Sequence, residues 1–338
     1  MTKEWSLQKG DNIQSFENVE GVLKALKNWS PFTPILVSKP QSDQFLPPTC
    51  HHQLATTIVS RYKARVQVCI AMTFTATLIT ILCLLVTGDI IFLKGSILFA
   101  LIIGAVLWDY CISFKSLHNL TTRTLFMYWL INSKYMKRII LGWLIFIIAL
   151  ATIQALMMYF LSGREAMFIL IGTVHSSVLD GEVWRLFVGP FLHSSVAHFL
   201  INATFLMLIG PLSWRLYSFR AVLILVLGSA IGALFSTLLA TFVDNYPYDS
   251  YAGLSPGIFA LYGAVFIAGT LNKTLLPQGI ALHLGFVALI SMVSAMVYYQ
   301  HSADASHWAG FILGALLSLC FNAKKIVFTD MNANDTPT

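Results

Sequence analysis

Long apolar stretches recur along the chain from residue 66 onward, separated by short polar segments. They predict eight membrane-spanning helices, at residues 66–87, 90–108, 139–161, 196–213, 221–243, 255–271, 279–299 and 305–321. Each stretch is close to the roughly 20 residues that cross a bilayer core as a helix. A single segment in lipid satisfies its own backbone polar groups as a helix but not as a strand. The pattern therefore predicts an all-α fold, a polytopic helical membrane protein.

The polar segments divide the chain into four expected parts. These are a cytoplasmic N-terminal segment (1–65), an extra transmembrane hairpin with a cytoplasmic loop (66–138), a core of six spans (139–322) and a cytoplasmic tail (323–338). In the first part, apolar residues at helical spacing predict a small helix within "FENVEGVLKALKNW", in a tail that lies near the bilayer. The stretch "SKPQSDQFLPPTCHHQ" is typical of an extended linker. The short aromatic stretch "TLFMYWLI" predicts a helix at the membrane interface.

Composition and charge agree with a membrane protein. Hydrophobic residues make up 57% of the 338 and charged residues 11%, against about 25% charged in soluble domains. The net charge of +6 could suggest nucleic acid as a partner, but the charges are sorted by side. With the N-terminus in the cytoplasm, only Lys94, Arg164 and Arg185 of the 21 Lys and Arg residues lie outside. This bias places both termini in the cytoplasm and makes the lipid bilayer, not nucleic acid, the expected partner.

The start of the chain bears on the cellular compartment, and the cysteines bear on disulfide and metal sites. "MTKEWSLQKGDNIQSF" resembles neither a signal peptide nor a transit sequence, which favours a bacterial plasma membrane. The five cysteines show no metal-like spacing and no disulfide framework. Cys50, His51 and His52 are adjacent but lack a second ligand pair, so we expect no metal and no cofactor.

Five polar residues in the later spans are the candidates for chemistry, because such groups are costly in lipid. His193, His198 and Asn202 stand at the start of the fourth span, Ser255 begins the sixth, and His307 begins the eighth. All three helices begin on the external side, so we expect the five residues at one depth. Taken singly, each has a simpler explanation, since serines often pack in spans, histidines lie at interfaces and asparagines tie helices together.

Ser255 and His307 can meet if their helices touch. Small residues follow each of them at helical spacing, at Gly310, Gly314 and Ser318 in one helix and at Gly257, Ala260, Ala264 and Ala268 in the other. Such stripes allow close helix packing, which would bring the imidazole to the hydroxyl as nucleophile activation requires. The helix start at Ser255 also offers unpaired N–H groups that suit an oxyanion. A zinc site of the H-E-x-x-H type and an aspartyl pair both lack the residues that they require.

Four motifs in this order resemble the rhomboid family of intramembrane serine proteases over roughly residues 139–321. They are "VWR" (183–185), "HSSVAHFLIN" (193–202), "GLSPG" (253–257) and "SHWAGFILG" (306–314). The resemblance implies a six-helix core and a hydrolase, a serine endopeptidase that cleaves transmembrane substrates near the outer membrane face. It implies Ser255 as nucleophile and His307 as general base, with His198, Asn202 and the Ser255 N–H as oxyanion hole. It gives supporting roles to His193, Gly253, Phe259, Gly310, Trp184 and Arg185.

Two positions depart from the family pattern. Pro256 follows the serine where glycine is usual, and Ser306 precedes the histidine where alanine is usual. A proline there keeps open an alternative, a non-catalytic rhomboid-like protein that binds or escorts membrane proteins. A transporter would require polar residues through the midplane of several spans, whereas here they gather on one side. The pattern carries no information on substrate identity or oligomeric state.

Overall fold

The computed structural model describes residues 4–243, 249–298 and 303–326. Contacts divide the chain into two compact units. Of the described residues, unit 1 contains 4–137 and 277–283, and unit 2 contains 138–243, 249–276, 284–298 and 303–326. Five described helices have the length and hydropathy to cross a membrane, and three shorter apolar helices lie at the other three predicted spans. The prediction of a polytopic helical membrane protein is confirmed.

Unit 1 begins with a small sheet that the sequence analysis missed. The elements are β1 (Trp5–Lys9), β2 (Asn12–Phe16), α1 (Val19–Ala25), β3 (Ile35–Ser38), the 3-10 turn η1 (Pro48–Cys50), α2 (His52–Thr87), α3 (Ile90–Ser113) and α4 (Leu117–Asn132). The antiparallel sheet has the order β2-β1-β3 and pairs Leu7 with Gln14 and with Val37. The turn between the first two strands uses Gly10 at φ +62°. Residues 4–65 therefore form a folded body rather than a tail.

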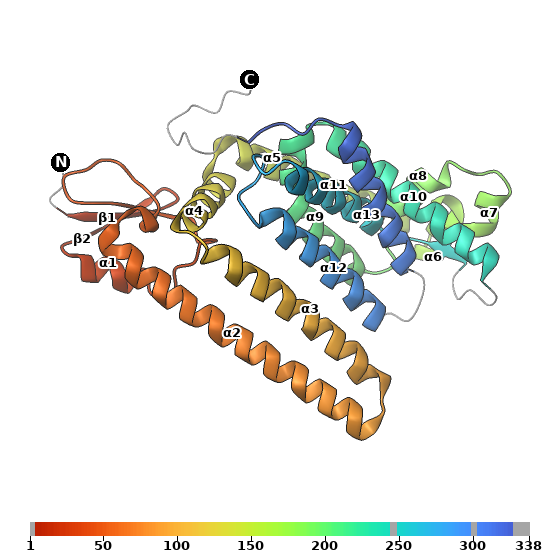
Figure 1. Cartoon of the computed structure of the whole chain (residues 1–338). Helices are drawn as coiled ribbons and strands as arrows, with labels where there is room; N and C mark the ends of the chain where they lie inside the picture. Colours follow the sequence, from red (N-terminus) through yellow and green to blue (C-terminus); the bar gives the residue numbers. More distant parts are fainter. Residues whose placement is uncertain (1–3, 244–248, 299–302, 327–338) are drawn as a thin grey trace. The chain divides into compact units, whose positions relative to one another are not determined.

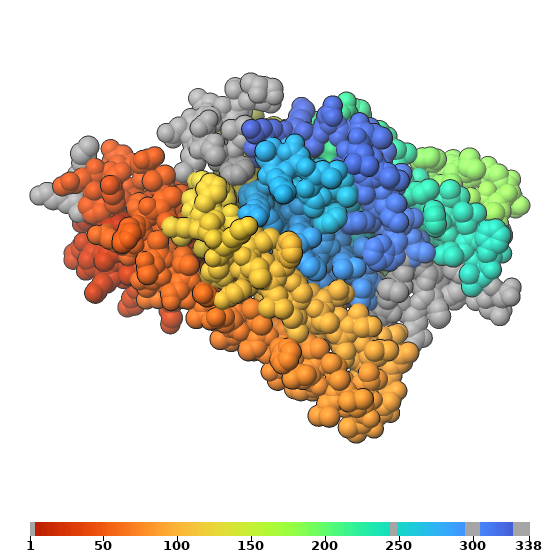
Figure 2. All heavy atoms as spheres, in the orientation of Figure 1, coloured from red at the N-terminus to blue at the C-terminus, as the bar shows by residue number. Residues whose placement is uncertain are grey.

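The core of this body joins the sheet to the first turns of α2. Val22 of α1 and Leu26, which caps it, are buried in one cluster with Leu54 and Ile58 of α2. Leu54 and Ile58 are four residues apart and so share one helical face. Because those turns are held by the folded body, α2 begins 14 residues before the predicted span at 66. Figure 1 shows α2 and α3 side by side as a hairpin, and the space-filling view shows the red and orange N-terminal residues packed as one body (Figure 2). The hairpin turns at Gly88, which has φ +67°.

A buried ion pair in unit 1 holds Asp109, a polar residue next to the predicted span 90–108, inside the fold. The guanidinium of Arg123 on α4, fully buried, pairs with the Asp109 carboxylate on α3 and donates to the carbonyl of Gln278. The Tyr62 hydroxyl and His283 also contact this carboxylate, at 3.2 Å each. Asp109 therefore links α2, α3, α4 and residues 277–283.

Unit 2 contains the candidate site. Its elements are α5 (Lys134–Phe160, which begins in unit 1), α6 (Arg164–Ile171), β4 (Thr173–Val174), α7 (His175–Leu179), α8 (Arg185–Val188), the 3-10 turn η2 (Gly189–Phe191), α9 (Val196–Tyr217), α10 (Arg220–Phe242), β5 (Ser250–Tyr251), α11 (Ser255–Leu271), α12 (Ile280–Tyr298, which also begins in unit 1) and α13 (Ala303–Cys320). The long segment before α9, predicted to be external, is thus built of short helices. It is tied to the chain before α11 by the two-residue ladder β4-β5.

Glycines set the separation of α10, α11 and α13. A Cβ at Gly314 of α13 would lie 2.5 Å from the carbonyl carbon of Ala260 on α11, and one at Gly263 would lie 3.0 Å from that of Phe311 on α13. Backbone therefore touches backbone along this pair, which is the packing that small residues permit. Gly257, expected on the same stripe, instead faces α10, where a Cβ would lie 3.1 Å from the carbonyl carbon of Leu225.

Candidate active site

The close packing of α11 and α13 brings Ser255 and His307 together. Nε2 of His307 lies 2.7 Å from Oγ of Ser255, within reach of a hydrogen bond from the hydroxyl to the ring. The Phe259 ring, one turn along α11, packs on the imidazole at a centroid distance of 4.7 Å. Among the described residues, Nδ1 of His307 has no hydrogen-bond partner, so the arrangement is a pair and not a triad. Ser255 is half-buried and His307 buried.

Position 253, in the turn before the serine, requires glycine. Gly253 has φ +115°, in the region that side chains rarely adopt. A Cβ there would lie 2.5 Å from Cε1 of His198 and 3.5 Å from Nδ2 of Asn202. The hydroxyl of the buried Tyr251 donates to the Gly253 carbonyl at 3.0 Å and holds this turn. The α9 side chains therefore approach the chain two residues before Ser255.

The start of α9 positions His198 and Asn202. Ser195 caps the helix by accepting from the His198 N–H at 3.1 Å, and Ser194 Oγ lies 3.2 Å from Nδ1 of His198. Asn202, one turn further, is buried, and its Nδ2 has no partner in the part of the chain that the structure describes. A buried donor without an acceptor is uncommon in folded proteins. Nδ2 of Asn202 can therefore donate to an acceptor that the described residues do not supply.

His193 lies beside the site rather than in it. Its ring packs edge-on against His198 and Phe199, at 5.3 Å and 5.1 Å between centroids. Gln154 of α5 clamps its backbone, accepting from the N–H at 3.0 Å and donating to the carbonyl at 2.8 Å. Burial, with a smaller contribution from His198, lowers the pKa of His193 to about 4. The ring is therefore neutral near pH 7 and supports His198 by packing.

Trp184 and Arg185 stabilise the segment between α6 and α9. Arg185 is buried, donates to the Gly172 carbonyl at 2.8 Å and pairs with Glu182. Its guanidinium also lies 4.9 Å from the centre of the Trp184 ring. Thr173 of β4 donates to the Arg185 carbonyl at 3.0 Å. Since β4 pairs with β5, these contacts reach the segment that leads to Ser255.

The ring of Pro256, the main departure from the family pattern, packs against α10. It occupies the first turn of α11, where the N–H that it lacks has no partner within the helix. A Cβ at Gly232 of α10 would overlap the proline ring. A Cβ at Gly310 of α13 would lie 2.7 Å from the Pro256 carbonyl carbon. The Pro256 ring therefore packs against Gly232, and the Pro256 backbone contacts Gly310.

Sequence reasoning missed three residues that build the site, namely Gln154, Gly232 and Tyr251. Gln154 is a polar residue within an apolar span, which is the signal that identified the histidines. Gly232 carried no comparable signal, because its partner Pro256 lies 24 residues away on another helix. Tyr251 is next to the serine motif, but nothing in the sequence indicates that its hydroxyl donates to the Gly253 carbonyl. The family resemblance also implies substrate entry beneath the loop "QHSADA" (300–305), of which residues 300–302 lie outside the described residues.

The fold and the site together define a polytopic helical membrane protein with a serine and a histidine paired at the starts of two tightly packed helices. Residues 180–324 match the family model of the Rhomboid domain. Relatives from Salmonella paratyphi A and Salmonella newport, each named Rhomboid protease GlpG, are 29% identical over 188 residues. The match covers 53% of this chain and 64% of each relative, so the chain spans just under two thirds of their length. These matches support a rhomboid family protein, with the Rhomboid domain in residues 180–324.

Proposed function

We propose that this protein is an intramembrane serine endopeptidase with a Ser255–His307 dyad. The observation that carries the proposal is the 2.7 Å separation between Ser255 Oγ and His307 Nε2. His307 takes the proton of the hydroxyl as Ser255 attacks a peptide carbonyl, and then gives it to the leaving amine. Water hydrolyses the resulting acyl-enzyme. Phe259, packed on the imidazole, holds the ring in the plane that this transfer requires.

The oxyanion is held by His198, Asn202 and the backbone N–H of Ser255. The unpartnered Nδ2 of Asn202 and its nearness to Gly253 support this assignment. The positive end of the α11 dipole adds to the stabilisation. Removing one such donor costs roughly 3 to 4 kcal/mol in soluble serine proteases. We therefore expect Asn202→Ala to lower kcat by about 100- to 1,000-fold.

The proposed substrates are transmembrane proteins cleaved near the outer membrane face. A peptide bond inside a helix is protected by its own hydrogen-bond ladder, so the cleaved segment must first unwind. The proposed topology has eight spans, both termini in the cytoplasm and the catalytic core within residues 139–322, in a bacterial plasma membrane. The charge bias of the sequence and the bacterial relatives support this placement.

The test compares four variants in detergent with a fluorophosphonate probe and a generic transmembrane substrate. Ser255→Ala and His307→Ala are expected to abolish both labelling and cleavage. Ser291→Ala and His118→Ala are the matched controls. Ser291 bonds to the Val287 carbonyl on α12 and His118 is exposed on α4, so both should behave as wild type. Cleavage that is equal in all four variants would exclude the dyad.

Labelling also separates the proposal from the non-catalytic alternative. A rhomboid-like binder would show no labelling that depends on Ser255, even when correctly folded. Retention of the thermal unfolding transition in Ser255→Ala would show that the loss of labelling comes from chemistry and not from misfolding.

A further inference from the structure

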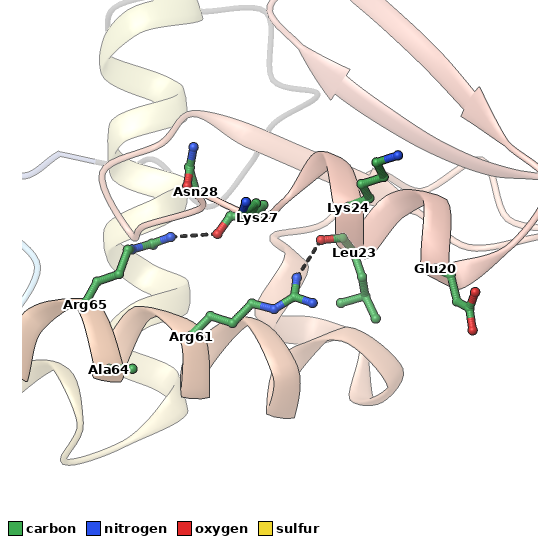
Figure 3. Close-up of a pocket in the computed structure, with 8 residues that line it drawn as sticks. All are labelled: Glu20, Leu23, Lys24, Lys27, Asn28, Arg61, Ala64 and Arg65. Atoms are coloured by element: carbon green, nitrogen blue, oxygen red, sulfur yellow. Dashed lines mark hydrogen bonds between the residues drawn. The ribbon is translucent and has the colours of Figure 1, made fainter.

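A basic hollow on unit 1 is unused by the proposed reaction. It has a volume of about 630 Å³ and is lined by Glu20, Leu23, Lys24, Lys27, Asn28, Arg61, Ala64 and Arg65. Figure 3 shows the α2 side chains facing the end of α1 and the loop that follows it. Four of the eight lining residues are cationic and one is anionic. This excess of positive charge favours an anion as the occupant of the hollow.

The two arginines are fixed in place. Arg61 donates to the Leu23 carbonyl at 2.7 Å and Arg65 to the Lys27 carbonyl at 2.7 Å, as the dashed lines in Figure 3 mark. Arg65 also donates to the carbonyl of Trp29. A guanidinium carries five N–H groups, so N–H groups remain for a further acceptor on each arginine. Positioned guanidinium groups recognise phosphate better than mobile charges do.

The length of α2 places this hollow at the membrane boundary. The 36 residues of α2 extend about 54 Å, whereas the hydrocarbon core is about 30 Å thick. About 16 residues therefore lie outside the core, and these are the N-terminal ones, because the apolar stretch begins at Val66. Arg65 directly precedes that stretch, and Arg61 lies about one turn earlier. The hollow thus opens at the level of the lipid headgroups.

We propose that this hollow binds the phosphate headgroup of an anionic phospholipid in the leaflet next to the N-terminal end of α2. The four cations supply the charge that such a headgroup requires, and basic pockets beside membrane helices are suited to it. Leu23 and Ala64 supply an apolar edge for the glycerol and the first acyl carbons. The bound lipid would fasten the folded N-terminal body to the bilayer surface, independently of the dyad.

The test uses the full chain in a neutral detergent, titrated with phosphatidylglycerol or with phosphatidylcholine and observed by native mass spectrometry. The test variant is Lys24→Gln/Lys27→Gln, since both side chains are exposed and can lose charge without disturbing a buried group. The control is Lys9→Gln/Lys39→Gln, two exposed lysines of the same body that do not line the hollow. Phosphatidylglycerol affinity is expected to fall about 30-fold in the test variant and to stay unchanged in the control.

Three outcomes would overturn the proposal. Equal phosphatidylglycerol binding by both double variants would mean that the hollow is not the site. Equal binding of phosphatidylcholine and phosphatidylglycerol by the wild type would mean that the headgroup charge is not recognised. Displacement of the lipid by inorganic phosphate at the same concentration would identify a soluble phosphate as the occupant. Thermal unfolding of both double variants, expected to match the wild type, shows that altered binding does not reflect lost folding.

Discussion

A single methyl group at position 310 should separate the proposed catalytic pair. In Gly310→Ala, the new Cβ would lie 2.7 Å from the Pro256 carbonyl carbon, whereas ordinary contact begins at 3.4 Å. Backbone cannot swing aside as a flexible side chain does, so α13 must retreat from α11 by about 0.7 Å or more, the difference between these distances. His307 lies one turn from Gly310 and moves with it. Its 2.7 Å separation from Ser255 then grows to about 3.4 Å, beyond the roughly 3.2 Å reach of such a bond.

A misplacement of this size costs about 100-fold in rate in enzymes whose groups must be aligned. The assay is the cleavage rate of a transmembrane substrate at saturation, with fluorophosphonate labelling as a second readout. Gly142→Ala is the matched control. Gly142 lies on α5, and a Cβ there meets nothing within 4 Å among the described atoms. If Gly310→Ala cleaved and labelled as fast as Gly142→Ala, helix contact would not be what sets the dyad, and this reasoning would be refuted.

Three further predictions concern other parts of the chain. Gly232→Ala should reduce cleavage because its Cβ overlaps the Pro256 ring, and adding Pro256→Gly should restore cleavage; a double variant no better than Gly232→Ala would contradict this. Asp109→Asn should lower the free energy of unfolding in detergent by about 3 to 5 kcal/mol, because it leaves the buried Arg123 without its countercharge; unchanged stability would be contrary evidence. The lowered pKa of His193 means that the unfolded chain binds a proton there between about pH 6.5 and 4 while the folded chain does not. Stability should therefore fall as the pH drops through this range, and the fall should be smaller in His193→Gln by up to about 3 kcal/mol, as measured by unfolding at each pH.

The apolar helices could be predicted from sequence because lipid imposes one strong rule. Each predicted span coincides with an apolar helix, and the boundaries differ by a few residues except at the start of α2. That exception has a physical cause. The first turns of α2 bury Leu54 and Ile58 against the sheet and α1, so the helix continues where hydropathy alone would end it. Hydropathy indicates which residues contact lipid. It carries no information on a folded body attached to a span.

The sheet itself had a local signal that was overlooked. "WSLQK" and "NIQSF" flank Gly10 and Asp11, a pair typical of a two-residue hairpin turn. The role of Asp109 had no such signal. It lies near a span end, where a short polar side chain ordinarily reaches the interface, and its partner Arg123 belongs to a different helix. A buried ion pair between two helices becomes predictable only when their packing is known.

The candidate site shows why single-residue departures from a family pattern are hard to weigh from sequence. Pro256 replaces a glycine next to the serine, and by itself it suggests a blocked or distorted site. In the fold, the proline ring faces α10, where Gly232 leaves room for it, while the serine hydroxyl on the preceding residue faces His307. The first turn of a helix also requires no N–H at that position, so the substitution removes no bond that the helix would make. The compatibility of proline with the proposed chemistry therefore depends on a glycine 24 residues away, and the pair is best considered as one unit of packing.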